Sequence, residues 1–402
     1  MTKIIMFVGG IETSEYFTLQ LAKSFQEMGH EIFLYQLQEE DRDFPSLCNF
    51  IEDGNTVVIT FNFHGLNFER PFYNNNRFFW EIEDIPCYNI VLDHPFYYHK
   101  FLEAVPPQYV NISIDREHEF YMKRYFPEIK RGPFLPLAGT GLFHKPYKER
   151  SKDIVFTGNY TPPSKFDKYI TRIDDEYTAF YRSIIKDLIT HPDLGMDEVF
   201  EIHLIREMDN PSNEDLKLCM ENMIFIDLYV RFHFRGLVIK TLADNGFKVH
   251  VYGSGWEYLE CKHSENLIIY GPQDSLGCLE AIGDAKISLN VMPWFKDGAH
   301  DRIFNSMLNG SLCLSDDSTW LRKNLVDNKE IVYYSLSQIE KLPGIVDSLL
   351  RNPDVSGEII QNGYRKAKSL HTWASRAEVL DKLIESDHKD YSKTSELVMT
   401  MK

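Results

Sequence analysis

The chain has 402 residues, of which 43% are hydrophobic and 14% aromatic, the composition of a folded globular protein rather than a disordered one. This length favours two domains over a single core. The net charge of −17 argues against a protein that binds nucleic acid duplexes or anionic membrane surfaces. A phosphate-bearing ligand remains compatible with this charge, because a local cluster of donors is enough to hold it.

The six cysteines are dispersed without CxxC spacing, which favours reduced thiols over a disulfide or zinc site. The opening residues Met1–Gly10 read as a strand and a glycine turn, not as a secretory signal. No segment approaches the roughly 20 apolar residues that a membrane span needs. We therefore expect a cytoplasmic protein with no transmembrane segment.

The first part of the chain reads as a Rossmann-like domain over residues 1–150. Strand Lys3–Val8 leads through Gly9-Gly10 into a helix over Ser14–Gly29, and strand Glu31–Leu37 follows. This βαβ start predicts a parallel sheet with right-handed crossovers. Three more strands are predicted, at Thr56–Phe61, Cys87–Leu92 and Val110–Ile114.

The Pro- and Gly-rich segment Gly132–Tyr147 is predicted to link this domain to a second Rossmann-like domain over residues 151–385. A charged, helical stretch over about residues 164–222 interrupts the second domain as an insertion. Residues 386–402 read as a polar tail. The strands of the second domain are predicted at Asp153–Thr157, Val249–Tyr252, Leu267–Tyr270, Ile287–Val291, Ser311–Leu314 and Ile331–Tyr334.

The segment Asn290–Asp316 carries the strongest functional signal. A polar loop, Phe295–His300, runs into a helix that opens with Asp301-Arg302 and stops at Asn309-Gly310. The free N–H groups and the dipole of a helix N-terminus favour anions, and this predicts a pyrophosphate site. Arg302 or Lys296 would add positive charge, while His300 or Asp301 would bond sugar hydroxyls.

Two further loops follow strands of the second domain, Gly253-Ser254-Gly255-Trp256 and Tyr270-Gly271-Pro272. Glycines at such positions let a ligand approach the backbone, although a tight turn beside a core Trp explains them as well. All these loops are predicted at the carboxyl edge of one parallel sheet, where ligands of open α/β folds bind.

Candidate general bases follow the strands of the first domain. His64 and the pair Asp93-His94 each end a strand, and a carboxylate beside an imidazole suits a general base. Asp115 and His118 form a further pair, for which a helix cap is an equal explanation. Gly9-Gly10 lacks the third Gly of a GxGxxG fingerprint, so an NAD site is weakly supported.

A metal site is not indicated. Asp41-Arg42-Asp43 is the one plausible DxD near a strand, and it lies in a polar loop of the first domain. GxSxG, HExxH and P-loop spacings are absent from the sequence. The sequence therefore predicts no obligatory cofactor.

Four stretches of the second domain resemble the C-terminal half of CgeB-like, spore-maturation-type glycosyltransferases, which are GT-B enzymes similar to the group-one glycosyltransferases. They are Asp153–Tyr160, Val249–Trp256, Ile269–Pro272 and Ser288–Asp316. Val91–His99 and Ile112–Pro127 resemble the less specific first domain of such enzymes. The resemblance implies an α/β protein with two Rossmann-like domains facing each other across a cleft, the nucleotide sugar on the second and the acceptor on the first.

The resemblance also implies which residues meet the donor. The GSGW loop would flank the nucleotide, Tyr270 and Gly271 would approach the base, and residues 300–302 would meet the pyrophosphate and sugar. Asn305 stands where such families carry a Glu that holds the ribose. The full set of expected donor residues is Gly158, Asn159, Gly253, Ser254, Gly255, Trp256, Tyr270, Gly271, Lys296, Gly298, His300, Asp301, Arg302 and Asn305. The expected catalytic residues are His94, Asp93, His64 and Arg302.

Together these features predict a metal-independent glycosyltransferase that moves a hexose from a nucleoside diphosphate sugar, with a UDP-sugar favoured, to a hydroxyl of a protein side chain or glycan. Whether the reaction inverts or retains stereochemistry stays open. A nucleotide-sugar 2-epimerase and a degenerate, non-catalytic member that binds a nucleotide or a partner are the alternatives. Asn305 in place of Glu is the feature that supports the non-catalytic alternative.

Overall fold

The computed structural model describes residues 1–142 and 145–400, with side chains described except at residues 40–41 and 390–400. Part of the predicted linker, the Asp41 side chain of the DxD sequence and the end of the predicted tail therefore lie outside the described residues. The chain forms two compact units. The first comprises Met1–Ile114, His118–Leu135 and His371–Lys402, and the second comprises Asp115–Glu117 and Pro136–Leu370.

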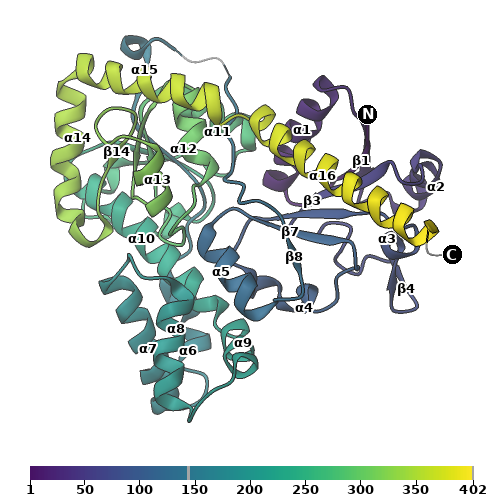
Figure 1. Ribbon diagram of the computed structural model, residues 1–402. Helices are drawn as coiled ribbons and strands as arrows, with labels where there is room; N and C mark the ends of the chain where they lie inside the picture. The colour runs from purple at the N-terminus through teal and green to yellow at the C-terminus, as the bar shows by residue number, and fades with distance from the viewer. Residues whose placement is uncertain (143–144, 401–402) are drawn as a thin grey trace. The chain divides into compact units, whose positions relative to one another are not determined.

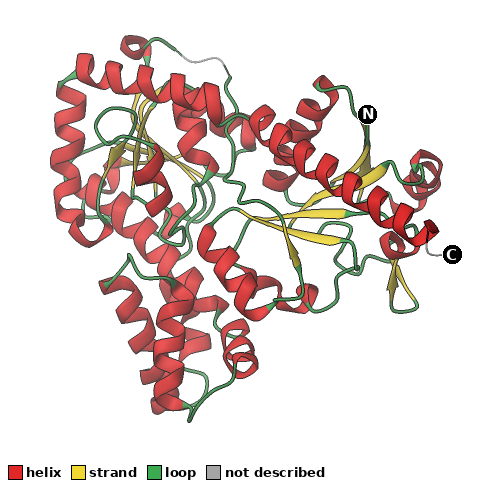
Figure 2. Ribbon diagram, in the orientation of Figure 1, coloured by secondary structure: helices red, strands yellow, loops and turns green. Residues whose placement is uncertain are grey.

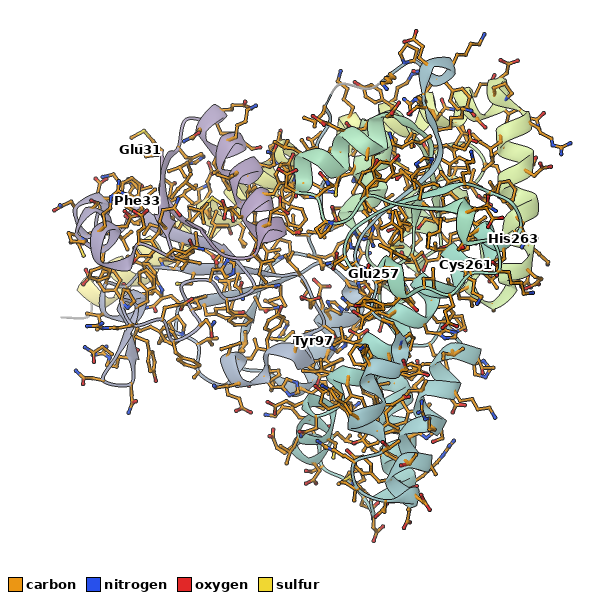
Figure 3. The ribbon with its side chains drawn as sticks, turned by 180° about the vertical axis from the view of Figure 1, so that it is seen from behind. Glu31, Phe33, Tyr97, Glu257, Cys261 and His263 are labelled. Carbon is orange, nitrogen blue, oxygen red and sulfur yellow. The ribbon has the colours of Figure 1, made fainter. Side chains whose placement is uncertain are left out.

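The first unit is built on a six-stranded parallel sheet with the order β2-β1-β3-β6-β7-β8 (Figures 1 and 2). Its central strands are almost wholly buried because helices cover the sheet, as parallel sheets require. Edge strand β2 is more exposed, and Figure 3 labels Glu31 and Phe33 on it. The strands are β1 (Lys3–Val8), β2 (Glu31–Gln36), β3 (Thr56–Phe61), β6 (Cys87–Val91), β7 (Tyr109–Ser113) and β8 (Lys130–Arg131), with a small hairpin of β4 (Tyr73–Asn74) and β5 (Arg77–Phe78).

The helices of the first unit connect these strands. The first of them buries Phe17, Leu21 and Phe25 on one face, as the spacing predicts, and ends before Gly29, whose φ of 91° suits a residue without a side chain. The helices are α1 (Glu12–Glu27), α2 (Glu40–Phe50), α3 (Phe79–Ile82), α4 (His99–Leu102), α5 (Arg116–Tyr125) and α16 (Trp373–Thr400).

The C-terminal helix α16 belongs to the first unit, whereas the sequence analysis placed residues up to 385 in the second domain and a polar tail beyond. The Trp373 ring lies 5.0 Å from that of Phe17 on α1. The Asp387 carboxylate accepts a 2.9 Å hydrogen bond from the Tyr88 hydroxyl. An amphipathic pattern indicates a buried face but not the sheet on which it packs, and this explains the different boundary.

The second unit contains another six-stranded parallel sheet, with the order β11-β10-β9-β12-β13-β14. Residues 155 and 156 in its centre are fully buried. The strands are β9 (Lys152–Thr157), β10 (Val249–Tyr252), β11 (Leu267–Ile269), β12 (Ala285–Asn290), β13 (Leu312–Ser315) and β14 (Val332–Tyr333). The predicted strands are all present, with ends shifted by one or two residues. Glu257, Cys261 and His263, labelled in Figure 3, lie on the connection from β10 to β11.

The predicted insertion is helical and forms a group of helices beside α10 (Figure 1). It contains α6 (Asp167–Ile170), α7 (Asp175–Thr190), α8 (Met196–Glu207) and α9 (Asn213–Glu221). The remaining helices of the unit are α10 (Ile224–Asp244), α11 (Ser275–Gly283), α12 (Asp301–Leu308), α13 (Thr319–Asn324), α14 (Leu342–Arg351) and α15 (Pro353–Leu370). Within the described residues, none of the helices has the length and apolarity that crossing a membrane requires.

Candidate functional site

The loops after β9 and β10 pack directly on one another at the carboxyl edge of the second sheet. A Cβ atom at Gly253 would lie 2.4 Å from the Gly158 oxygen, and one at Gly255 would lie 2.0 Å from the Tyr160 oxygen. Both glycines also have positive φ, of 142° and 84°. The contact with a neighbouring loop therefore explains these two glycines, as the turn interpretation had it.

Side chains lock the same two loops together. Asn159 accepts a 2.9 Å hydrogen bond at Oδ1 from the Ser254 amide. Trp256 is fully buried, donates from Nε1 to the Gly158 oxygen at 2.8 Å and stacks on Tyr160. Trp256 is thus a core residue that fixes the loop, and the predicted donor residues of these two loops come together in one cluster.

Tyr270 lies beyond the end of β11 and presents an open aromatic surface. Its side chain is 44% exposed and stacks on Tyr252 with ring centroids 4.4 Å apart and planes 6° apart. The carbonyl of Gly271 accepts a 2.8 Å hydrogen bond from the Gly253 amide, which joins this loop to the glycine loop after β10. A half-exposed ring at a fixed tilt suits stacking by a planar group.

The N-terminus of α12 carries a buried imidazole–carboxylate pair. The Nδ1 atom of His300 lies 2.5 Å from Oδ1 of Asp301 and 3.3 Å from the Arg302 amide nitrogen. Burial and the charge of Arg302 lower the pKa of His300 to about 4. Burial alone would raise the pKa of Asp301, but His300 and Arg302 outweigh it and lower that pKa. At pH 7 this helix terminus therefore presents a neutral imidazole.

Arg302 connects α12 with the ends of β9 and β12. It donates to the main-chain oxygen of Thr157 at 3.0 Å and to Oδ1 of Asn290 at 2.8 Å. Its third bond reaches the Val291 oxygen at 3.4 Å. A guanidinium group has five N–H donors. These three bonds fix its position and leave the remaining N–H groups for a ligand. The predicted phosphate residue is thus also an anchor for two loops.

Asn305 faces the segment that enters the second unit. Its Oδ1 atom accepts the Thr140 amide at 2.8 Å, and its Nδ2 atom donates to Oδ2 of Asp301 at 2.8 Å. One turn later, Asn309 holds the same segment through the amide of Leu142 and the oxygen of Thr140. The amide of Asn305 therefore has a structural role, whatever its part in donor binding.

Two arginines of α10, which the sequence analysis missed, lie at this site. The guanidinium carbons of Arg231 and Arg235 lie 4.1 Å and 5.1 Å from the ring centroid of Trp294. Phe156 likewise lies 6.0 Å from Arg235 and 5.3 Å from Arg302. We call Arg231, Arg235 and Arg302 the arginine cluster. The signal for it was the spacing of Asp227, Arg231 and Arg235, each four residues from the next on a largely apolar helix, which places them on one face.

Within the arginine cluster, Arg235 and Arg302 are buried, while Arg231 is half-buried and pairs with the buried carboxylate of Asp227 at 2.8 Å. Arg235 is 8% exposed, and burial together with Arg302 and Arg231 lowers its pKa well below the usual range. It donates to the Asn159 oxygen at 2.9 Å, while its Nε atom finds no hydrogen-bond partner among the described residues. Buried like charges repel one another, so an anion bound here would relieve a cost that the free protein carries.

The predicted residues Lys296 and Gly298 lie on the loop between β12 and α12. The ammonium group of Lys296 donates to the oxygens of Pro192 and Pro293, and burial lowers its pKa to about 8. The amide of Lys296 donates to the buried carboxylate of Asp115 at 2.8 Å. Gly298 forms a β-bridge with Asp115. The loop is therefore held in place both by the side chain of Lys296 and by main-chain contacts with Asp115.

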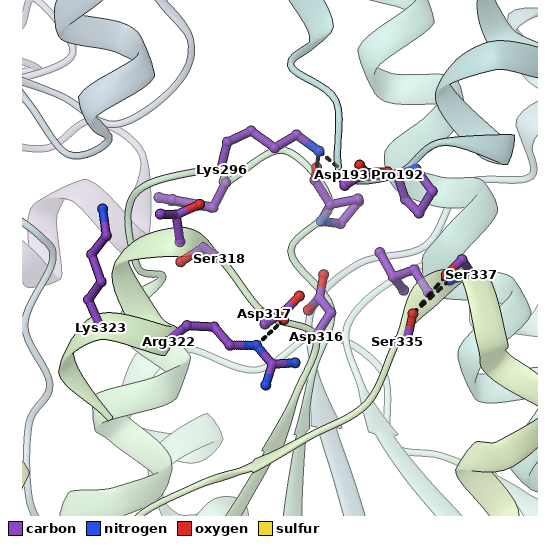
Figure 4. A pocket seen from close by; sticks show the side chains of 14 residues that line it. Pro192, Asp193, Lys296, Asp316, Asp317, Ser318, Arg322, Lys323, Ser335 and Ser337 are labelled. Carbon is purple, nitrogen blue, oxygen red and sulfur yellow. Dashed lines mark hydrogen bonds and ion pairs between the residues drawn. The ribbon is translucent and has the colours of Figure 1, made fainter. Parts of the chain in front are cut away.

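A cavity of about 690 Å³ adjoins this loop at the carboxyl ends of β12, β13 and β14 (Figure 4). Its size is that of a small-molecule site. Burial raises the pKa of Asp316 in its wall to about 7, and both oxygens of that carboxylate accept the Met292 amide. The charged and hydroxyl lining residues are Asp193, Lys296, Asp316, Asp317, Ser318, Thr319, Arg322, Lys323, Ser335 and Ser337.

In the first unit, His64 lies in a tight turn after β3. Asn62 and Phe63 have positive φ values of 47° and 66°, a conformation that Asn tolerates and that is strained for Phe. A Cβ atom on Gly10 would lie 2.7 Å from the His64 ring, so the Gly9-Gly10 loop touches the imidazole. Burial lowers the pKa of His64, which keeps the ring neutral at pH 7.

Asp93 and His94 have separate partners. Asp93 accepts the Tyr98 hydroxyl at 3.0 Å. His94 is 8% exposed, accepts the Phe96 amide at Nδ1 and packs its ring near His118. Burial, His118 and His99 lower the pKa of His94 well below its usual range. The imidazole of His64 is the more accessible of the two candidate bases.

The whole chain is similar to solved GT-B glycosyltransferase structures. Sucrose-phosphate synthase from Thermosynechococcus elongatus matches with a TM-score of 0.55 and 11% identity over 96% of this chain and 99% of the other. HepE from Anabaena in complex with UDP-glucose matches with a TM-score of 0.52 and 8% identity, over 96% of this chain and 100% of the other. An alpha-glucosyltransferase in complex with UDP matches with a TM-score of 0.52 and 11% identity, over 96% of this chain and 100% of the other. The fold of this protein is GT-B, which confirms the predicted fold class.

The sequence itself points the same way over part of its length. Residues 235–382 match the family model described as glycosyl transferase-like. This segment contains Arg235, the loops after β10 and β11, and α12, and thus much of the site in the second unit. No curated protein matches the chain significantly. The narrower CgeB-like resemblance remains a prediction.

Proposed function

We propose that this protein is a glycosyltransferase whose second unit binds a nucleoside diphosphate sugar. The observation that carries the proposal is the arginine cluster. Three guanidinium groups, two of them buried and the third paired with Asp227, meet behind the loops after β9 and β12, and Nε of Arg235 lacks a hydrogen-bond partner within the described part of the chain. A diphosphate supplies negative charge beyond the single carboxylate of Asp227 that pairs with Arg231. The GT-B fold and the family match of residues 235–382 support the same reading.

The order of features along the sheet suits an extended donor. The exposed Tyr270 ring follows edge strand β11, the arginine cluster lies by β9 and β12, and the cavity lies beyond β12, β13 and β14. Neighbouring strands are about 4.8 Å apart, so these places follow one another at intervals of roughly 10 Å. We assign the base to Tyr270, the diphosphate to the arginines and the sugar to the cavity, where carboxylates and hydroxyls bond sugar hydroxyls.

In this proposal, the cluster stabilises the leaving diphosphate as its negative charge grows. Arg302 and Arg235 act from fixed positions, so little reorganisation accompanies the reaction. Three guanidinium groups offer the charge that a divalent metal provides elsewhere, and we propose that no metal is obligatory. UDP is the favoured nucleotide, because solved structures of this fold include complexes with UDP and UDP-glucose. For an inverting reaction, His64 is the proposed base for the acceptor hydroxyl.

Product analysis tests the proposal. The protein is incubated in separate reactions with UDP-glucose and with other UDP-, GDP- and ADP-sugars, each with a chelator and with or without a panel of protein and glycan acceptors, and free nucleotide and all sugars are quantified. A glycosyltransferase yields UDP and a glycosylated acceptor, or free glucose when water replaces the acceptor. Conversion of UDP-glucose to its 2-epimer alone would favour the epimerase. An intact protein that consumes no UDP-, GDP- or ADP-sugar would overturn the proposal in favour of the non-catalytic alternative.

A further inference from the structure

The helical insertion of the second unit carries an apolar groove of about 580 Å³, away from the strand ends that form the donor site. Helices α7, α8 and α9, the residues just before α7 and the turn before α10 line it. Its floor is formed by the buried residues Tyr181, Leu204 and Met223, and its walls by Tyr177 and Phe180. Tyr177, Phe180 and Tyr181 are spaced i, i+3 and i+4, so they share one face of α7.

Two large apolar side chains stand at the rim of this groove. Ile173 and Leu218 are each 63% exposed. Exposed apolar residues are ordinary when scattered, but around an aromatic groove they form a continuous apolar surface, which is typical of an interaction site. A groove between helices with aromatic walls fits the apolar face of an amphipathic helix.

The charge of the groove selects the partner. The charged residues of its lining are Asp174, Glu176 and Glu207, all acidic. Arg172, next to the rim, is engaged with the hydroxyl of Tyr177 at 2.9 Å and stacks over that ring. Acidic groups around an apolar groove favour Lys and Arg flanking the apolar anchors of a ligand and disfavour an acidic one.

We propose that this groove docks a basic amphipathic helix of a partner protein, with Leu- or Phe-type anchors entering the groove and Lys or Arg side chains meeting its acidic rim. The occupant is thus a protein segment, not a sugar or a nucleotide. The inference does not rest on the proposed transferase activity, because docking needs no donor.

The test uses the full chain and a fluorescein-labelled peptide of about 18 residues made of Leu and Lys, with Leu at helical spacing i, i+3, i+4 and i+7. Fluorescence polarisation is measured without nucleotide. We expect saturable binding below about 100 μM. Leu218→Lys should weaken it at least about tenfold. Ile205→Lys is the matched control, because Ile205 is 52% exposed on α8 and lies outside the lining of the groove.

The inference would be overturned by no saturable binding, by equal binding of a Leu/Glu peptide of the same pattern, or by the same loss in both variants. Hydrogen exchange of the complex should show protection in residues 173–181 and 204–223. Sedimentation of the free protein tests a second copy as the occupant, and self-association that Leu218→Lys abolishes would also count against a basic partner. Donor binding measured on the same samples separates this inference from the proposed function.

Discussion

The guanidinium group of Arg235 donates a 2.9 Å hydrogen bond to the main-chain oxygen of Asn159. Helix α10 thereby reaches the loop that follows the central strand β9. The bond places a buried positive charge at the point of the fold where the donor diphosphate is proposed. Burial, Arg302 and Arg231 oppose this charge and lower the pKa of Arg235 well below its usual range, while Asp227 favours it. Retention of such a repulsive group is typical of a binding site that trades stability for function.

Arg235→Met should therefore stabilise the free protein while weakening donor binding at least about a hundredfold. The substitution removes repulsion and a desolvated charge but keeps apolar bulk, which should raise the free energy of unfolding by about 1 kcal/mol and the melting temperature by about 2–4 °C. Calorimetric unfolding of the wild type and of Arg235→Met, both without nucleotide, measures this gain in stability. Arg351→Met serves as control, since Arg351 is exposed and pairs with Asp347. A strongly destabilised Arg235→Met protein would contradict the account.

Asn305→Glu should lower stability without improving nucleotide affinity. The new carboxylate would lose the donor that Asn305 offers to Asp301 and would bring a second negative charge beside it. We expect a loss of about 1–2 kcal/mol in the free energy of unfolding, measured by urea denaturation. Asn245→Glu, at an exposed position after α10, is the control. If Asn305→Glu instead binds UDP more tightly than the wild type, position 305 lies at the ribose as the family resemblance implies.

Asp316→Asn should change how stability depends on pH. The folded pKa of Asp316, about 7, lies above the ordinary value of 3.8. The folded state therefore binds more protons than the unfolded state between about pH 4 and pH 7, and the wild type loses stability as pH rises through that window, by up to about 1.4 kcal/mol per pH unit. The variant lacks this contribution, so its stability relative to the wild type should increase from pH 5 to pH 8.

Urea denaturation at several pH values measures this difference, and Asp354→Asn, an exposed position on α15, provides the baseline. The asparagine keeps an oxygen that accepts the Met292 amide, so the comparison isolates the ionisation. A constant difference between the Asp316→Asn and wild-type proteins across this range would show that Asp316 does not titrate there.

His64→Gln should lower turnover and leave donor affinity unchanged if the reaction inverts. The neutral His64 ring can accept a proton at pH 7, and Gln keeps its polarity without a titratable group. We expect kcat for UDP release to fall by about 10²–10⁴ with little change in KM. His263→Gln, which alters an exposed imidazole on the connection from β10 to β11, is the control. Undiminished turnover of His64→Gln would remove this base from the mechanism.

The fold was largely predictable because its elements carry strong local signals. The strands of both sheets are apolar runs bounded by glycine or polar residues, and α12 begins and ends where His300 and Asn309 indicate. The returning helix α16 was placed differently because its contacts with Phe17 and Tyr88 depend on residues far away in the sequence. Such long-range contacts leave no mark on local periodicity.

The candidate site was predictable at its loops but not at its charges. Sequence position alone brought Gly158, Gly253 and the start of α12 to one sheet edge, and the structure brings these elements together. The partners of Trp256 and Asn305 were not predictable, because they are a main-chain oxygen and an amide of distant segments. Arg231 and Arg235 were not predicted as site residues, because their contact with Trp294 joins segments that are far apart in the sequence.

The central claim, that the arginine cluster holds a nucleoside diphosphate, is tested most directly by calorimetric titration of the protein with UDP, GDP, ADP and NAD in the presence of a chelator. The account predicts micromolar binding of UDP, about −8 kcal/mol, that weakens at least about a hundredfold in Arg235→Met and is unchanged in Arg351→Met. Absence of binding by any diphosphate to the folded wild-type protein, or equal binding by Arg235→Met, would contradict it.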